Sequence, residues 1–345
     1  MKSMDLNKQL KIWLAPMEGV VDPVIRKLYS QIGGYDFMVT EFVRVTDKIN
    51  PDKTFKKYCP EINNNSLTDF GTPVFVQLLG GQTIPMSENA QALVQLGVRG
   101  IDINFGCPAK TVNRHDGGAA LLKDPTRVYD VTKAIRSVVP HNIPVSAKVR
   151  LGFEDKSLSH EIAMAASEAD ASWLTIHART KIEGYRPPAH WHYIAKMKEV
   201  STIPVIANGD IWTTEDYEKC YAITNCPSVA LGRGAIADPY LALKIKNPNF
   251  ELTKLQQWEE IKNKWLPLFI QESIQFKSEH FALVRTKQWL KLLGRTHPQA
   301  LELFESIKRF KELTAAQSFL NINLLSSFES NNFKPNHSSI SSNVL

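Results

Sequence analysis

A cysteine and a lysine stand out in this sequence because their surroundings suit them to chemistry. Cys107 lies between a glycine and a proline in the segment NFGCPAK (104–110). Lys148 interrupts the apolar run VSAKVRL (145–151). Because a buried lysine is costly without a partner for its charge, two interpretations are open. Lys148 either pairs with a carboxylate such as Asp102, or it faces the edge of a cofactor on which negative charge develops.

Two glycine-containing segments could bind a phosphate group. These are NGD (208–210) and GRG (232–234). Glycine allows the backbone to approach a ligand closely, and an arginine such as Arg233 can hold a phosphate through paired hydrogen bonds. The alternative is that these glycines only allow the chain to turn.

The elements that would position these residues are predicted from eight short apolar runs, each followed by a helix-like stretch. The runs are residues 12–17, 37–43, 73–80, 101–107, 144–152, 173–179, 204–211 and 228–234. Continuous apolar character is typical of strands buried on both faces of a parallel sheet. Asp22-Pro23 and Asp124-Pro125 are signals for helix starts, and Thr214 is followed by two acidic residues. We therefore predict a (β/α)₈ TIM barrel over residues 1–246. A doubly wound open sheet is less favoured, because no GxGxxG follows the first run.

Active sites of such barrels lie at the carboxyl ends of the strands. The polar and turn residues at those ends are therefore the predicted site, and the loops after strands seven and eight are the usual place for a phosphate. We expect Cys107 to lie at this rim, next to a segment (113–118) that could act as a lid. The other cysteines are expected to be small buried residues: Cys59, Cys220 and Cys226.

Helical patterns replace strands after residue 246. They predict a small helical bundle over residues 247–325, in which Pro267 kinks or breaks the first helix and Pro298 begins another. The Ser/Asn-rich segment 326–345 is expected to be a flexible tail. Residues 277–295 contain one acid and five basic residues, which are Lys277, Arg285, Lys287, Lys291 and Arg295. This segment is either a solvated face that packs through Trp289, or a surface that follows RNA phosphates.

The composition excludes several classes of protein. The chain has 345 residues, of which 43% are hydrophobic and 22% charged, so it is not wholly disordered, a coiled coil or a collagen. Its net charge of +6 is compatible with a polyanionic partner but is only a weak indication of one. No long apolar run or signal-peptide core is visible, and the cysteines form no CxxC pairs. We expect a cytoplasmic monomer without a membrane segment or a metal site.

In order along the chain, several motifs resemble those of the tRNA-dihydrouridine synthases, over roughly residues 10–320. They are APMEG (15–19), NFGCP (104–108), GGAALLKDP (117–125), KVRLG (148–152), HART (177–180), GYR (184–186), NGDI (208–211) and GRGA (232–235). The segments EFVRV (41–45) and ALVRTKQWL (282–290) are most similar to the bacterial C-type subfamily, which reduces the uridine at position 16 of the tRNA D-loop. The segment NRHD (113–116) is bulkier than the family pattern.

The resemblance implies an FMN enzyme that uses NADPH to saturate the C5–C6 double bond of a uridine in tRNA. Cys107 would be the general acid, which gives a proton to C5 while hydride from the flavin adds to C6. A thiol with a pKa near ~8.5 can serve as such an acid if no neighbouring cation removes its proton. The implied cofactor-binding residues are Pro16, Met17, Glu18, Gln77, Lys148, His177, Asn208, Gly209, Asp210, Gly232 and Arg233. The implied contacts with uridine or tRNA are Arg44, Asn104, Arg150, Tyr185 and Arg285, and the basic segment 277–295 adds Lys287 as an expected tRNA contact.

Two other functions compete with this one. An FMN-dependent barrel oxidoreductase acting on a free pyrimidine or enone would explain the barrel but would leave the basic C-terminal helices without a role. A non-catalytic RNA-binding protein built on a decayed barrel is disfavoured by the intact Cys107, Lys148 and Arg233.

Overall fold

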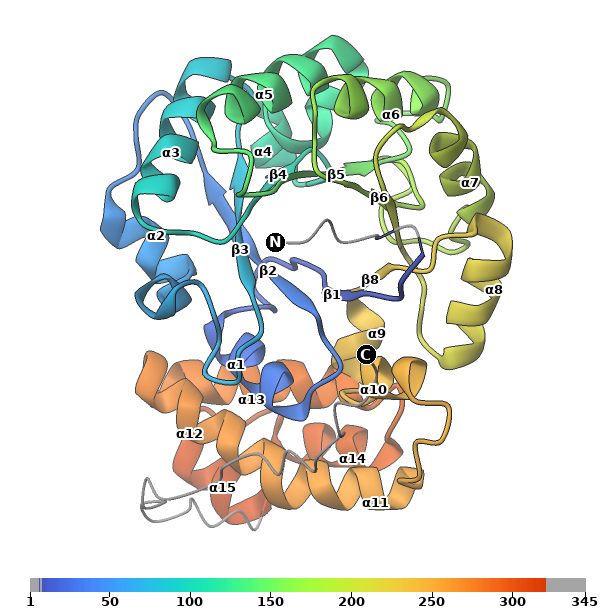
Figure 1. Ribbon diagram of the computed structural model, residues 1–345. Coiled ribbons are helices and arrows are strands. Elements are labelled where there is room, and N and C mark those ends of the chain that lie inside the picture. Colours follow the sequence, from blue (N-terminus) through green and yellow to red (C-terminus); the bar gives the residue numbers. More distant parts are fainter. Residues whose placement is uncertain (1–5, 7, 321–345) are drawn as a thin grey trace, which may run out of the picture.

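Eight parallel strands close into a barrel, in sequence order, with helices outside (Figure 1). The computed structural model describes residue 6 and residues 8–320. The strands are β1 (Ile12–Leu14), β2 (Phe37–Arg44), β3 (Val74–Leu79), β4 (Ile101–Asn104), β5 (Val145–Arg150), β6 (Leu174–His177), β7 (Val205–Asn208) and β8 (Val229–Leu231). Each lies within or overlaps a predicted apolar run, and the TIM barrel prediction is confirmed.

The interior of the barrel is apolar at the amino end of the strands and polar at the carboxyl end. Trp13, Phe37, Phe75 and Trp173 form the apolar layer, with neighbouring ring centroids 4.9 to 5.7 Å apart. Side chains two residues further along a strand point to the same face. The next layers therefore hold polar residues that strand register places side by side, such as Gln77 beside Asp102 and Asn104 beside Lys148.

Capping residues begin several of the outer helices as the sequence predicts. Asp22 accepts a hydrogen bond from the backbone N–H of Ile25 at the start of α1 (Pro23–Ile32), and Asp124 caps α5 (Pro125–Val138) in the same way. Helix α8 (Thr214–Thr224) is capped by Thr213, whose side chain and that of Asp216 form a capping box. The other barrel helices are α2 (Asp52–Tyr58), α3 (Thr83–Gln95), α4 (Lys110–Arg114), α6 (Ser159–Glu168), α7 (Trp191–Val200), α9 (Arg233–Ala237) and α10 (Leu241–Lys246).

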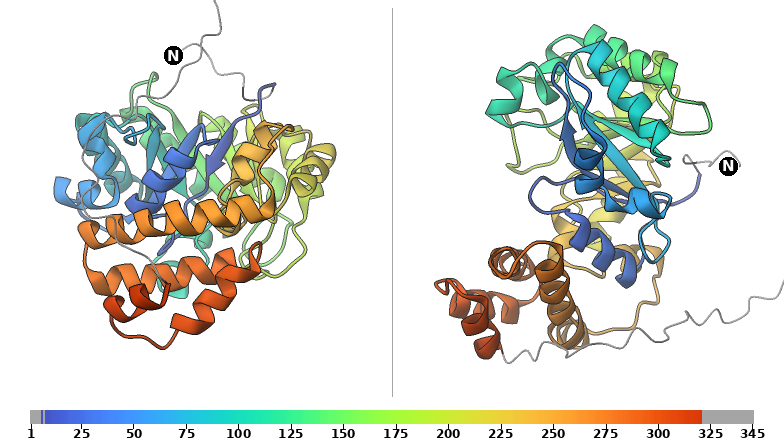
Figure 2. Two further views of the ribbon diagram at one scale, coloured as in Figure 1. Left: turned by 90° about the horizontal axis from the view of Figure 1, so that it is seen from below. Right: turned by 90° about the vertical axis from the view of Figure 1, so that its left-hand side faces the viewer.

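The remaining helices lie together on one side of the barrel, next to α1 and α9 (Figures 1 and 2). They are α11 (Lys254–Glu260), α12 (Leu266–Phe276), α13 (Glu279–Leu293), α14 (Pro298–Ile307) and α15 (Leu313–Leu320). A π-helical segment, Ile261–Trp265, joins α11 to α12 just before Pro267, so the expected break appears as a local change of helix type. The predicted tail, residues 326–345, lies outside the described residues. Among the residues that are described, no helix has both the length and the apolar character to cross a bilayer.

A buried arginine attaches the C-terminal helices to the barrel. Arg285 of α13 is 5% exposed. Its Nε donates to Asp22 Oδ2 over 2.9 Å, and its terminal nitrogens donate to the carbonyl oxygens of Gly19 (2.8 Å) and Val20 (2.6 Å). One turn further on, Trp289 packs against Phe269 with ring centroids 4.8 Å apart. The loop after β1 is thereby held from outside the barrel.

We predict that Arg285→Ala lowers the free energy of unfolding by about 3 kcal/mol, because it leaves the buried Asp22 carboxylate without its cation. Urea denaturation measures this change. Arg295→Ala is the matched control: Arg295 follows the same helix and is exposed, so we expect a loss below about 1 kcal/mol. Equal stabilities of the two variants would contradict the interface role of Arg285.

Candidate active site

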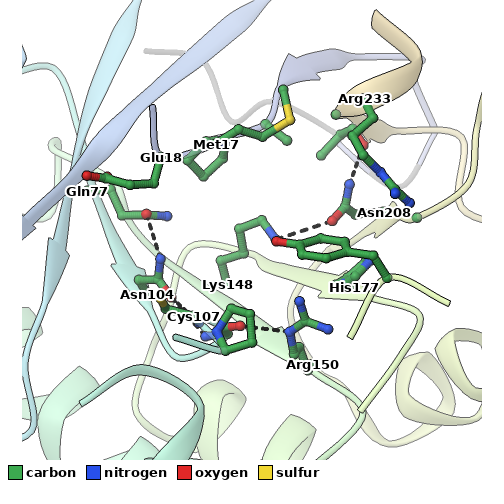
Figure 3. A pocket seen from close by; sticks show the side chains of 18 of the residues that line it. Met17, Glu18, Gln77, Asn104, Cys107, Lys148, Arg150, His177, Asn208 and Arg233 are labelled. Carbon is green, nitrogen blue, oxygen red and sulfur yellow. Dashed lines mark hydrogen bonds between the residues drawn. The ribbon is translucent and has the colours of Figure 1, made fainter. Parts of the chain in front are cut away.

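An open cleft of about 920 Å³ lies at the carboxyl ends of the strands. Side chains from all around the barrel point into it (Figure 3). The sequence-predicted residues that line the cleft are Pro16, Met17, Glu18, Gln77, Asn104, Cys107, Lys148, Arg150, His177, Tyr185, Asn208, Gly209, Asp210, Gly232 and Arg233. The structure thus brings together nearly all of the predicted site. Arg44, Arg285 and Lys287 are not part of the lining.

The loop that carries Cys107 is held by side-chain hydrogen bonds. Asn104 Oδ1 accepts from the backbone N–H groups of Gly106 (2.9 Å) and Cys107 (2.8 Å). Asn113 Nδ2 donates to the carbonyl oxygen of Cys107 over 3.0 Å. Arg150 Nε donates to the carbonyl oxygen of Gly106 over 2.7 Å. The backbone on both sides of the thiol is therefore fixed, and the segment expected to be a lid supplies one of the anchors.

The Cys107 thiol keeps its proton at neutral pH. Partial burial raises its pKa, and the negative charge of Glu18 acts in the same direction. The backbone N–H of Ala109 and the charge of Arg150 oppose this rise without overcoming it. The sequence set the condition that no neighbouring cation removes the proton. That condition is met because burial raises the Cys107 pKa by more than the charge of Arg150 lowers it.

Lys148 is held by an amide and not by a carboxylate. Its Nζ donates to Asn208 Oδ1 over 3.2 Å, whereas Asp102 is hydrogen-bonded to Gln77 and Ser146. Burial and the charge of Arg150 lower the pKa of Lys148, and the charge of Asp102 opposes that shift. Lys148 is therefore not hydrogen-bonded to Asp102, although the charges of the two residues interact. The ammonium group lines the cleft.

His177 is a neutral imidazole in this cleft. It is 7% exposed, and burial together with the charges of Arg150 and Lys148 lowers its pKa well below the usual range. The backbone of Gly209 passes so close that an added Cβ would lie 3.1 Å from the His177 ring. Gly209 also has φ +123°, a conformation that side chains other than glycine rarely adopt. This glycine is needed for packing, which supports the turn interpretation at one position.

The carboxylate of Asp210 is occupied by two arginines. It accepts hydrogen bonds from Arg233 over 3.3 Å and from the fully buried Arg179. Asp210 therefore positions cations at the predicted phosphate end of the cleft. The Arg233 guanidinium also lies between two aromatic rings, 5.0 Å from the centroid of Tyr185 and 5.2 Å from that of Trp212.

Glu41 and Trp212 also line the cleft, although the sequence did not single them out. Glu41 Oε1 accepts from the backbone N–H of Gly19 over 2.5 Å. Burial and the neighbouring Glu41 raise the pKa of Glu18 to about 7. Glu41 lies inside β2, three residues before Arg44, and a carboxylate within an otherwise largely apolar run was the available signal. Because the register shifts between Val39 and Phe42, alternation along β2 does not predict which way the Glu41 side chain points.

The expected RNA contacts on α13 need correction. Arg285 is inside the interface with the barrel, and its donors are used by Asp22, Gly19 and Val20, so it offers no exposed charge to RNA. Lys287 is half-buried, and its Nζ donates to the carbonyl oxygen of Phe310 over 2.5 Å. The exposed basic residues of the same segment are Lys277, Lys291 and Arg295, and Arg44 is exposed at the end of β2.

Comparison with known proteins identifies one family. The family model for dihydrouridine synthase (Dus) matches residues 13–327. The chain is 47% identical to tRNA-dihydrouridine(16) synthase of Shewanella oneidensis, over 88% of this chain and 94% of the relative. It is 44% identical to the protein of the same name from Neisseria meningitidis serogroup A, over 91% and 95%.

Solved structures share the barrel at much lower identity. A variant of NCR from Zymomonas mobilis superposes with a TM-score of 0.50 at 16% identity, over 72% of this chain and 90% of that one. Histamine dehydrogenase from Rhizobium sp. 4-9 superposes with a TM-score of 0.52 at 13% identity, over 76% and 48%. These likenesses support the fold.

Because its pKa is raised, Cys107 should react with iodoacetamide through a pH midpoint above the ~8.5 of an exposed thiol. Arg150→Met should move this midpoint higher, since the Arg150 charge favours the thiolate. Arg233→Met is the matched control, because Arg233 is not among the groups that shift the Cys107 pKa. The other cysteines are at most 1% exposed and should react little with iodoacetamide. Their remaining reaction is measured in Cys107→Ala and subtracted. A midpoint at or below neutral pH would contradict the neutral thiol.

Proposed function

The chain belongs to the dihydrouridine synthase family, and from this premise we propose that it reduces the C5–C6 double bond of a uridine in tRNA. The product is 5,6-dihydrouridine, the cofactor FMN and the electron donor NADPH. The similarity to tRNA-dihydrouridine(16) synthases supports position 16 of the D-loop as the target. Such a substrate favours a cytoplasmic enzyme, and we propose that it acts as a monomer. The observation that carries the proposal is the position of Cys107, which lines the cleft on a loop held by Asn104 and Asn113.

The cleft has the donor set that a flavin mononucleotide requires. Lys148 Nζ makes one side-chain hydrogen bond, to Asn208, so it retains donors for the polar edge of a ring. Ala15, Pro16 and Met17 line the cleft with apolar side chains against which a flat ring could pack, and Arg233 offers a cation for the phosphate. When bound, the flavin supplies the hydride that adds to C6 of the uracil.

The proton for C5 comes from the Cys107 thiol in this proposal. The S–H bond breaks as the new C–H bond forms, which leaves a thiolate at Cys107. The charge of Arg150 stabilises that thiolate, since it already lowers the thiol pKa from its buried value. The fixed backbone around Cys107 holds the sulfur in place for the transfer.

A target base must leave the RNA stack to reach such a cleft. Tyr185 is 55% exposed at the rim, with the Arg150 guanidinium 5.4 Å and the Arg233 guanidinium 5.0 Å from its ring centroid. Arg233 is in turn 5.2 Å from the ring of Trp212. On that ring the exposed Arg295 stacks at 4.7 Å. This series of arginines and aromatic rings joins the C-terminal helices to the thiol loop.

We therefore place the RNA contact of the C-terminal helices at Arg295 and the exposed Lys291, with Arg44 on another part of the rim. Arg295 forms no ion pair with a carboxylate among the residues that the structure describes. An unpaired guanidinium beside the cleft suits an RNA phosphate. A free pyrimidine or enone would not use this surface, so the structure favours RNA over the small-molecule alternative.

Cys107→Ala should retain the flavin absorbance and lose turnover by about 100-fold or more, because the proton donor is absent. Mass spectrometry of tRNA from a deletion strain measures dihydrouridine restored by each variant at a single D-loop position. Cys220→Ala is the control, since Cys220 is buried in α8 away from the cleft. Near wild-type modification by Cys107→Ala would contradict the acid assignment, and unchanged tRNA in the deletion strain would contradict the proposed function.

Arg295→Ala should weaken tRNA binding and reduce the slope of log affinity against log salt by about 1, as expected for one lost phosphate contact. Titration of labelled tRNA at several salt concentrations measures both quantities, and flavin content should not change. Arg99→Ala is the matched control, because Arg99 is exposed just before β4, at the opposite end of the barrel. Equal salt slopes for the two variants would contradict the Arg295 contact.

A further inference from the structure

A continuous line of buried hydrogen bonds connects the barrel interior to the thiol loop. Ser146 Oγ donates to Asp102 Oδ1 over 2.5 Å, and Gln77 Nε2 donates to Asp102 Oδ2 over 2.6 Å. Gln77 Oε1 accepts from Asn104 Nδ2 over 2.8 Å (Figure 3). Ser146, Asp102 and Gln77 are at most 2% exposed, so water cannot replace these partners.

The direction of every hydrogen bond in this line is set by its two ends. At the loop end, the N–H groups of Gly106 and Cys107 can only donate, so the Asn104 oxygen must face them. The Asn104 amide nitrogen must then face Gln77, whose oxygen accepts and whose nitrogen points away. A buried acceptor is therefore required at residue 102. A carboxylate supplies it without an alternative orientation, because both of its oxygens accept.

We propose that Asp102 is a positioning residue for the Cys107 loop, acting through Gln77 and Asn104. It does not line the cleft, and Lys148 donates its hydrogen bond to Asn208 and not to Asp102. By holding the Gln77 amide in one orientation, it holds the Asn104 oxygen on the two backbone N–H groups that place the thiol. The link to catalysis rests on the proposed function, whereas the control of the loop does not.

The proposal separates variants by whether they keep the acceptor. Asp102→Leu removes it and frees the Gln77 amide to turn, whereas Asp102→Asn keeps an oxygen that can face Gln77. Ser146→Ala is the matched control, since it removes a hydrogen bond from the other Asp102 oxygen and leaves the acceptor for Gln77 in place.

The stability of the loop can be measured by amide hydrogen exchange of the flavin-loaded protein. The exchange rate is followed in a peptide that contains Gly106 and Cys107. We expect exchange about tenfold faster in Asp102→Leu, because an unsatisfied buried donor removes the preference for one orientation. Asp102→Asn and Ser146→Ala should stay within about twofold of the wild type. In variants with faster exchange, the kcat for tRNA should fall, while the KM for tRNA should stay the same.

A double-mutant cycle with Gln77→Met tests the route. Gln77→Met should loosen the loop by itself, and Asp102→Leu should add nothing in that background. Unchanged loop exchange in Gln77→Met would overturn the proposal even if Asp102→Leu does not fold. Where Asp102→Leu does fold, additive effects in the double variant would overturn it as well. If the loop responds as expected but the wild type forms no dihydrouridine, the proposed function fails and the positioning role stands.

Discussion

Charged and polar groups inside a closed barrel must satisfy one another, because water does not reach most of them. In this protein the parallel register places Asp102, Gln77 and Ser146 at one level and Asn104 beside Lys148 at the next. Their hydrogen bonds form above a layer of packed aromatic rings. The thiol loop is connected to this arrangement through Asn104, whose side chain also bonds to the backbone of Gly106 and Cys107.

The C-terminal helices contact two of the loops that line the cleft from outside the barrel. Arg285 ties α13 to the loop after β1, and that loop carries Met17 and Glu18 into the cleft. The stacked pair of Arg295 and Trp212 makes a second connection, to the loop after β7. A change in the packing of these helices would therefore shift the loops after β1 and β7, which line the cleft. The C-terminal helices are thus connected to the carboxyl end of the barrel at two places.

Much of the site could be predicted from the sequence, because a parallel barrel brings the residues at all its strand ends to one rim. Asn104, Lys148, His177 and Asn208 follow from this rule alone. The burial of Arg285 does not, since its acceptors are two backbone carbonyls and a carboxylate more than 260 residues away, and none of these has a local signature. Glu41 could not be predicted by alternation, because it lies within the register shift between Val39 and Phe42 of β2.

The cleft poses an apparent contradiction, because it is rich in cations and yet its thiol remains protonated. The resolution lies in the balance between burial and charge. Arg150 donates hydrogen bonds to the carbonyl oxygens of Gly106, Thr180 and Gly184, and it affects the Cys107 thiol through its charge. Burial then dominates the thiol pKa, and the charge of Arg150 acts only at a distance. The same charge can still stabilise a thiolate once the proton has left, which is the electrostatic condition that a neutral acid requires.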